Sequence, residues 1–307
     1  MDLMTRYLGL PLRSPIVAAA SPLSTWVDGI RALADGGVGA IVLSSIFAEQ
    51  IRSEPEVRAA YLRLVEQASP LVDVPLIASL NGSTRGTWPS FAAEVEQAGA
   101  AAIELNVHIP PGDVRTHARD VEQRHLDVLS RVRASTSLPV AVKLSPYLSS
   151  VGELATALDS AGAAGLVVFN RFFQPDIDLD LLALSTQPHL STPDEARLSR
   201  TWVSALRGRV QGSLAGNTGV DTAEDVVKYL LAGADVVMTA SALLRHGPGH
   251  AQVLSDGVLA WIKARGFEDV DAIRGLLATP LGGDQLARAR AGYVAMIQQG
   301  ARAYLTE

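Results

Sequence analysis

Cysteine is absent from this 307-residue chain. Without thiols the chain cannot form disulfides, thiolate metal sites or iron–sulfur clusters, and it has no cysteine nucleophile. A protein of this kind that carries out redox chemistry cannot hold its own iron–sulfur relay.

Long apolar runs and an excess of positive charge are also lacking. The longest apolar stretches fall well short of the roughly 20 residues that a membrane helix needs. The opening residues, MDLMTRYLGLPLRSP, show no charged region followed by an apolar block, so we expect no secretory signal and a cytoplasmic location. The net charge of −6 argues against a nucleic-acid-binding surface. We therefore expect neither nucleic acid nor a membrane as a partner.

Short apolar runs recur along the chain, each rich in Val, Ile, Leu and Ala and without strict alternation. This composition is typical of parallel strands that are buried on both faces. Eight such runs are found, at 15–20, 39–44, 75–80, 101–106, 139–144, 165–170, 211–216 and 235–240.

Amphipathic stretches lie between these runs and predict helices. Four of them, at 26–37, 88–100, 151–163 and 222–234, end in small residues and glycine, which indicates a helix C-terminus. Eight strands alternating with helices predict a (β/α)₈ TIM barrel of the α/β class, with residues 1–307 forming a single domain. An open doubly wound sheet is the alternative, although no G-x-G-x-x-G follows the first strand.

Three connections are longer than the usual loop of a βα unit, at 45–59, 107–119 and 171–197. In a barrel all three would emerge at the carboxyl ends of the strands, where active sites are built. An eighth helix is expected at about 249–265. The tail at 267–307 predicts a helical extension that packs on the barrel, with a dimer contact as the alternative.

Polar side chains stand at the ends of several apolar runs. Asn81, Asn106, Asn170 and Lys143 occupy such positions, and Ser44 ends the second run. A buried amide or ammonium costs several kcal/mol unless it is partnered. Structural partners could satisfy any one of them, but the set as a whole favours a bound ligand.

The last two runs indicate what that ligand contains. AGNTGV, with Gly216, Asn217, Thr218 and Gly219, and TASALLRHG, with Ala240 and Ser241, are turns of small residues that enter helices. Exposed backbone N–H groups in such turns can bind phosphate, and barrels often place phosphate sites there.

Lys143 lies on the fifth run, across the expected barrel from these turns. A fixed positive charge at that place suits an electron-rich ring that gains negative charge, such as the N1 edge of a reduced flavin. The alternative is an ion pair inside the barrel.

Several motifs together resemble the dihydroorotate dehydrogenase family of FMN barrels over about residues 14–265. They are ELN before a proline loop, VKLSPY, FN, GNTGV and LAGADVVMTASALL. SSIFAEQI (44–51), SLNGST (79–84) and FNRFFQPDIDLD (169–180) are similar to its divergent branch, the dihydroorotate dehydrogenase-like proteins.

This resemblance implies bound FMN, a role in pyrimidine metabolism and a homodimer. It places Ala19, Ala20 and Ser21 along the flavin through backbone groups. Asn81, Asn106 and Lys143 would meet the isoalloxazine or the ribityl, and Asn170 the ring edge. Gly216, Gly219, Ala240 and Ser241 would hold the phosphate through main-chain N–H groups.

The substrate half departs from the family pattern. Orotate-specific members carry a Cys or Ser base after ELN, and here that place falls on Ile109 or its neighbours. An expected asparagine is Pro111, an expected lysine is Leu43, and the N-S-x-G substrate loop is missing from 45–59. Removing a general base typically costs ~10²–10⁴ in rate, so dihydroorotate is not the expected natural substrate.

Three residues are candidates for the missing chemistry. His108 stands next to the vacated position, and a histidine can titrate near neutrality, although this one could simply position the loop. Tyr147 could donate a proton or serve only in packing. Arg171 could clamp a substrate carboxylate with its guanidinium fork, or pair with Asp176, Asp178 or Asp180. We interpret these three acids as a solvated strand edge and expect no metal site.

The sequence thus predicts an FMN-dependent oxidoreductase acting on CH–CH groups. It would pass hydride between flavin N5 and a small acidic or amide-bearing substrate, and electrons to a soluble acceptor or a partner protein. Two alternatives stay open. One is a non-redox lyase or isomerase that acts on a phosphorylated metabolite, with Lys143 as an acid or Schiff-base lysine. The other is a catalytically degenerate binding subunit.

Overall fold

A closed barrel of eight parallel strands forms the centre of the computed structural model, which describes residues 2–82, 88–107, 109, 115–171, 176–185, 189–282 and 285–305. Pairing between β4 and β6 closes the barrel, and the short β5 (Ile46–Phe47) pairs with the end of β6, beyond the residues that β4 pairs with. All eight predicted strands are present. They are β3 (Ile16–Ala18), β4 (Ala40–Val42), β6 (Leu76–Asn81), β7 (Ala102–Asn106), β8 (Val140–Lys143), β9 (Gly165–Val168), β12 (Ser213–Asn217) and β13 (Val236–Thr239).

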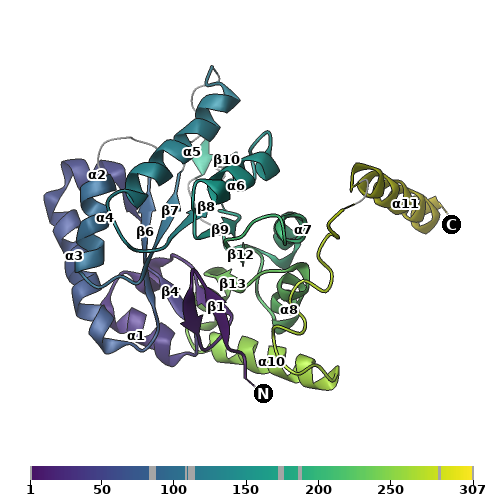
Figure 1. Ribbon diagram of the computed structural model, residues 1–307, viewed down its shortest axis with the longest axis horizontal. Coiled ribbons are helices and arrows are strands. Elements are labelled where there is room, and N and C mark those ends of the chain that lie inside the picture. Colours follow the sequence, from purple (N-terminus) through teal and green to yellow (C-terminus); the bar gives the residue numbers. More distant parts are fainter. Residues whose placement is uncertain are drawn as a thin grey trace.

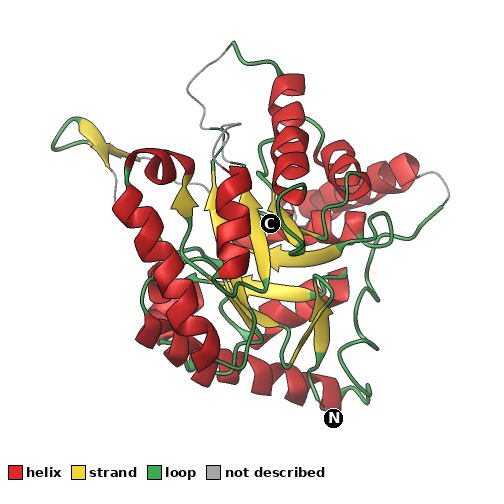
Figure 2. Ribbon diagram, turned by 60° about the vertical axis from the view of Figure 1, so that its left-hand side comes forward, coloured by secondary structure: helices red, strands yellow, loops and turns green. Residues whose placement is uncertain are grey.

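Helices surround the barrel on its outside, as Figures 1 and 2 show. The main ones are α1 (Val27–Asp35), α3 (Pro55–Ala68), α4 (Trp88–Gln97), α5 (Ala118–Arg133), α6 (Val151–Ser160), α7 (Ala196–Leu206), α8 (Ala223–Ala232) and α10 (His250–Ala264). Shorter helices are α2 (Ala48–Ser53), α9 (Ser241–His246), η1 (Pro22–Ser24), η2 (Ser69–Leu71) and η3 (Pro193–Glu195). The four predicted helices and the expected eighth helix are confirmed, so the fold is a (β/α)₈ TIM barrel.

Two apolar cores are separated by the strands. Alternate residues point inward, so that Val17, Ile77, Val167 and Met238 fill the barrel and are almost fully buried. The opposite faces of the same strands pack against the ring of helices. Because both faces are apolar, the strands appear in the sequence as continuous rather than alternating runs.

An antiparallel hairpin of β1 (Thr5–Tyr7) and β2 (Leu10–Leu12) closes the amino-terminal end of the barrel. Tyr7 and Leu12 are buried in the barrel's inner core. The hairpin is held by hydrogen bonds from the Leu8 N–H to Ser213 Oγ (3.0 Å) and from Thr5 Oγ1 to the Asp235 carbonyl (3.0 Å). The sequence did not predict this hairpin, because its strands are only three residues long.

The C-terminal tail divides into two parts. Val270 and Ile273 are buried against the barrel's helices, whereas α11 (Gln285–Leu305) stands apart from the barrel in Figure 1. The helix itself is confirmed, but its expected packing on the barrel is not found, since Tyr293 and Ile297 are more than half exposed. In the described part of the chain no helix combines the length and the apolar character needed to span a membrane.

Packing inside the barrel can be tested with a matched pair of substitutions. Ile77→Ala removes a side chain that is 1% exposed, and we expect it to lower the free energy of unfolding by about 2–5 kcal/mol. Ile177→Ala, in the hairpin of β10 (Asp176–Asp178) and β11 (Ala183–Ser185), removes one that is 65% exposed. It should change stability by less than ~0.5 kcal/mol. Urea unfolding measures both, and equal losses would contradict the assigned core.

Candidate functional site

A cavity of about 160 Å³ opens at the carboxyl ends of the barrel strands. It joins strand ends that are far apart in the sequence, as the predicted barrel requires. Nine residues predicted from the sequence line it: Ala19, Ala20, Lys143, Asn170, Asn217, Thr218, Gly219, Ala240 and Ser241; the candidate Arg171 lines it too.

The turn after β12 forms one wall of this cavity. Thr218 and Gly219 both have positive φ angles, of 84° and 68°. A Cβ on Gly219 would lie 2.7 Å from both the Ala196 nitrogen and the Thr192 carbonyl oxygen, so only glycine fits there. Asn217 Nδ2 and Thr218 Oγ1 donate to the Phe169 carbonyl at 2.6 and 3.2 Å. The turn is therefore fixed to the end of β9.

Tyr229 supports the same turn from behind. Its hydroxyl lies 2.9 Å from the Asn217 carbonyl oxygen and 2.8 Å from that of Thr218. Burial raises the pKa of Tyr229, so the hydroxyl keeps its proton as a donor. Gly216 does not line the cavity described above. Its missing side chain makes room for Tyr229, whose ring would lie 2.2 Å from a Cβ at this position.

Ser191 reaches the cavity from the long connection after β9, and the sequence did not point to it. Its backbone N–H and its hydroxyl both donate to Ser241 Oγ, at 3.0 and 2.9 Å. The Gly219 N–H donates to Ser191 Oγ over a long 3.4 Å. The connection thereby folds back onto the turns after β12 and β13.

Amides and an ion pair occupy the other side. Asn170 Nδ2 donates to Asn106 Oδ1 at 3.0 Å. Lys143 Nζ lies 3.1 Å from Oε1 of Glu104, a carboxylate that the sequence reasoning did not weigh. The ion pair that was the alternative for Lys143 is therefore present, and Lys143 also lines the cavity. The sequence did contain a signal for Glu104. This acid stands two residues before Asn106 and therefore lies on the same face of an otherwise apolar strand.

Arg171 pairs with Glu195, which is none of the three acids considered from the sequence. Its Nε lies 2.7 Å from Glu195 Oε2. Burial alone would raise the pKa of Glu195, but hydrogen bonds from Arg171 and Thr192 lower it. Asp176 and Asp178 accept backbone N–H groups within their own exposed hairpin. No group of three or more acidic or histidine side chains that could hold a metal is found among the described residues.

The remaining candidates lie elsewhere. Tyr147 is 67% exposed and lines an adjoining cavity of about 260 Å³, which shares Asn170, Arg171 and Thr218 with the first. Ser21 Oγ accepts from the Leu23 N–H at 3.3 Å and so caps η1, and Ser44 lines a separate cavity of about 220 Å³. Asn81 is buried at the end of β6. His108 lies outside the described residues.

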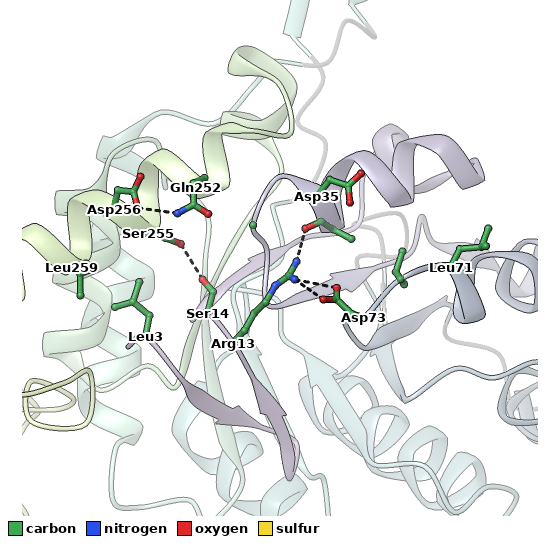
Figure 3. A pocket seen from close by; sticks show the side chains of 13 residues that line it. Leu3, Arg13, Ser14, Asp35, Leu71, Asp73, Gln252, Ser255, Asp256 and Leu259 are labelled. Atoms are coloured by element: carbon green, nitrogen blue, oxygen red, sulfur yellow. Dashed lines mark hydrogen bonds and ion pairs between the residues drawn. The ribbon is translucent and has the colours of Figure 1, made fainter. Parts of the chain in front are cut away.

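A cavity of about 640 Å³, shown in Figure 3, lies at the opposite end of the barrel. Arg13 crosses it and donates to Asp73 at 2.9 and 3.0 Å and to the Val38 and Ala34 carbonyls. Ser14 Oγ lies 3.1 Å from Ser255 Oγ. These polar groups already form hydrogen bonds with one another. They lie at the amino ends of the strands, where barrels hold stabilising rather than catalytic residues.

Comparison with known proteins places this chain in a family. The sequence model described as "Dihydroorotate dehydrogenase" matches residues 54–261. The chain belongs to the dihydroorotate dehydrogenase family. A relative from Methanothermobacter thermautotrophicus, "Dihydroorotate dehydrogenase B (NAD(+)), catalytic subunit", is 28% identical over 89% of this chain and 98% of its own. Another from Lactobacillus delbrueckii subsp. bulgaricus, "Dihydroorotate dehydrogenase A (fumarate)", is 26% identical over 80% of this chain and 79% of its own.

Members of the dihydroorotate dehydrogenase family are FMN-dependent oxidoreductases that act on CH–CH groups, and this protein is one of them. The recognition made from the motifs is therefore confirmed.

The support that Tyr229 gives to the turn can be measured. Tyr229→Phe removes the donor that faces the Asn217 and Thr218 carbonyls. We expect it to lower the free energy of unfolding by about 1–3 kcal/mol, because a buried polar group loses its partner. Tyr293→Phe on α11, 62% exposed, is the matched control and should change stability by less than ~0.5 kcal/mol. Equal urea midpoints for Tyr229→Phe and the unsubstituted protein would contradict this role.

Proposed function

We propose that this dihydroorotate dehydrogenase family member transfers hydride between FMN N5 and a C–C bond of a small acidic or amide-bearing substrate other than dihydroorotate. The observation that carries the proposal is the cavity at the strand ends. Lys143 and Asn170 stand on one side of it, and the Thr218–Gly219 turn and Ser191 on the other. The Lys143 cation and the asparagine amides match the flavin ring, and the turn of small residues that faces them matches the phosphate.

The turn side suits the phosphate. Thr218 and Gly219 line the cavity together with Ala240 and Ser241, and their main-chain N–H groups would be the donors. Backbone N–H groups and hydroxyls are good phosphate donors. Asn217 and Gly216 would act indirectly, by fixing the turn and by making space for Tyr229.

The opposite side suits the ring. Lys143 would lie against its electron-rich edge, with Asn106 and Asn170 as hydrogen-bonding neighbours, Asn81 beyond them, and Ala19 and Ala20 contributing backbone. The volume of about 160 Å³ is below the ~300–1,000 Å³ of most ligand pockets, so it fits one end of the cofactor. The adjoining cavity of about 260 Å³ shares Asn170, Arg171 and Thr218 with it and offers the remaining room. Bound FMN would supply the hydride-transfer chemistry.

The substrate would meet Arg171, Tyr147 and the residues that follow Asn106. Arg171 lines both cavities and can present its guanidinium to an acidic group, although Glu195 holds its Nε. His108 is the candidate acid or base nearest the position that the family's Cys or Ser occupies. Reoxidation would be by a soluble acceptor, such as the fumarate named for one relative, or by a partner protein.

The ion pair of Lys143 opposes the lyase alternative. A Schiff-base lysine must lose its proton to act as a nucleophile. Here the Lys143 Nζ is instead held in an ion pair by the carboxylate of Glu104, which lies 3.1 Å away and is 1% exposed.

The cofactor can be tested directly by the visible absorption spectrum of the purified protein. We expect the two bands of an oxidised flavin, with FMN released on denaturation. Protein stripped of flavin should take up added FMN, whereas Lys143→Met should bind it more weakly. A colourless protein that fails to take up FMN would overturn the proposed function.

The substrate is tested by anaerobic reduction of the bound flavin. Dihydroorotate should bleach it about 10²–10⁴ times more slowly than it bleaches a relative with the Cys or Ser base. Dithionite should bleach the flavin of both proteins at once, which is the control that each flavin can be reduced. Rapid bleaching by dihydroorotate, measured by stopped-flow absorbance, would show that another group supplies the base and that dihydroorotate is a substrate.

A further inference from the structure

Glu104 is a carboxylate inside the barrel that the proposed reaction does not use. It stands in the middle of β7 and is 1% exposed. Its Oε1 lies 3.1 Å from Lys143 Nζ, while its Oε2 is buried with no hydrogen-bond partner among the described residues. A carboxylate in such surroundings is costly unless a partner of opposite charge compensates it.

Among the residues around Glu104, Lys143 is the partner of opposite charge that compensates the carboxylate. The residues opposite Glu104 and Lys143 on neighbouring strands are Ser79, Ala141, Asn106 and Val167, and none is charged. Lys143 is the one lysine or arginine among the buried residues that the structure describes. The net charge of the pair inside the barrel is therefore close to zero.

Two buried tyrosines are also influenced by the Glu104 charge. Burial first, and Glu104 second, raise the pKa of Tyr7, with a smaller effect of Asp235. Burial raises the pKa of Tyr61 too, with Glu104 adding to it and the hydrogen bond from the Ser79 N–H opposing it. Both phenols therefore stay neutral and do not cancel the charge of Glu104.

Because of where the Glu104–Lys143 pair lies, its charge balance would affect a bound flavin. Lys143 lines the strand-end cavity, and Glu104 lies two residues deeper on the adjacent strand. A flavin gains negative charge on reduction, so a lone ammonium at its edge favours the reduced form. A carboxylate behind that ammonium offsets the effect, because charges separated by a low-dielectric interior interact strongly.

We propose that Glu104 is a positioning residue that fixes the Lys143 ammonium at the floor of the cavity and lowers the reduction potential of the bound FMN. This inference rests on the proposed function, since it requires FMN against Lys143. It assigns to the acid of the ELN segment a role in setting how readily the flavin accepts electrons.

The test is the midpoint potential of the bound flavin, measured by spectroscopic titration against a reference dye. Glu104→Gln keeps the shape of the side chain and removes its charge. We expect the equilibrium constant for two-electron reduction to rise at least tenfold, a shift of about 30 mV to more positive potential. Glu104→Asp, which keeps the charge, should restore the potential towards that of the unsubstituted protein. An unchanged potential in FMN-loaded Glu104→Gln would overturn the inference.

A second comparison covers the case in which Glu104→Gln fails to fold. Lys143→Gln is compared with the double variant Glu104→Gln/Lys143→Gln, whose interior carries no unpaired charge. The double variant should have the higher potential, again by at least tenfold in the equilibrium constant, and equal potentials would overturn the inference. Failure of the unsubstituted protein to bind FMN would instead overturn the proposed function, so the two failures are distinguishable.

Discussion

The ion pair between Glu104 and Lys143 is the constraint on which the arrangement of the site depends. Both side chains lie inside a barrel that is otherwise filled by apolar residues such as Val17, Val167 and Met238. Neither charge can be buried alone, because desolvation of an isolated ion exceeds what packing can offset. The register of β7 and β8 must therefore keep the two groups in contact. The same register places Asn106 beside Lys143 at the edge of the cavity.

The opposite wall of the cavity is built by contacts between segments that are distant in sequence. The turn after β12 is tied to the end of β9 through the Phe169 carbonyl and is supported from behind by Tyr229. Ser191, on the connection that leaves β9, returns to Ser241 after β13. A wall fixed from three directions keeps its N–H groups in place before a ligand arrives, which lowers the entropic cost of binding.

The flavin half of the site resembles the dihydroorotate dehydrogenase family, whereas the substrate half differs from it. The cavity brings together residues that the family resemblance assigns to the flavin, whereas the same resemblance finds no counterpart of the Cys or Ser base or of the N-S-x-G loop of the substrate half. Arg171 pairs with Glu195 and faces a second cavity beside the first. Under the proposed function, this combination would change the substrate and keep the reaction class, because the flavin carries the redox chemistry.

What the sequence determined by itself is the local pattern and its consequences. The eight apolar runs fixed the barrel, since fully buried parallel strands need helices on their outer face, and the strand-end residues Lys143, Asn170 and Gly219 followed from that topology. The absence of cysteine excluded thiol chemistry. Tertiary structure alone decided which residues meet across the barrel. Glu104 with Lys143, Ser191 with Ser241, and Arg171 with Glu195 rather than with Asp176 are contacts over 24 to 50 residues, and no local periodicity encodes them.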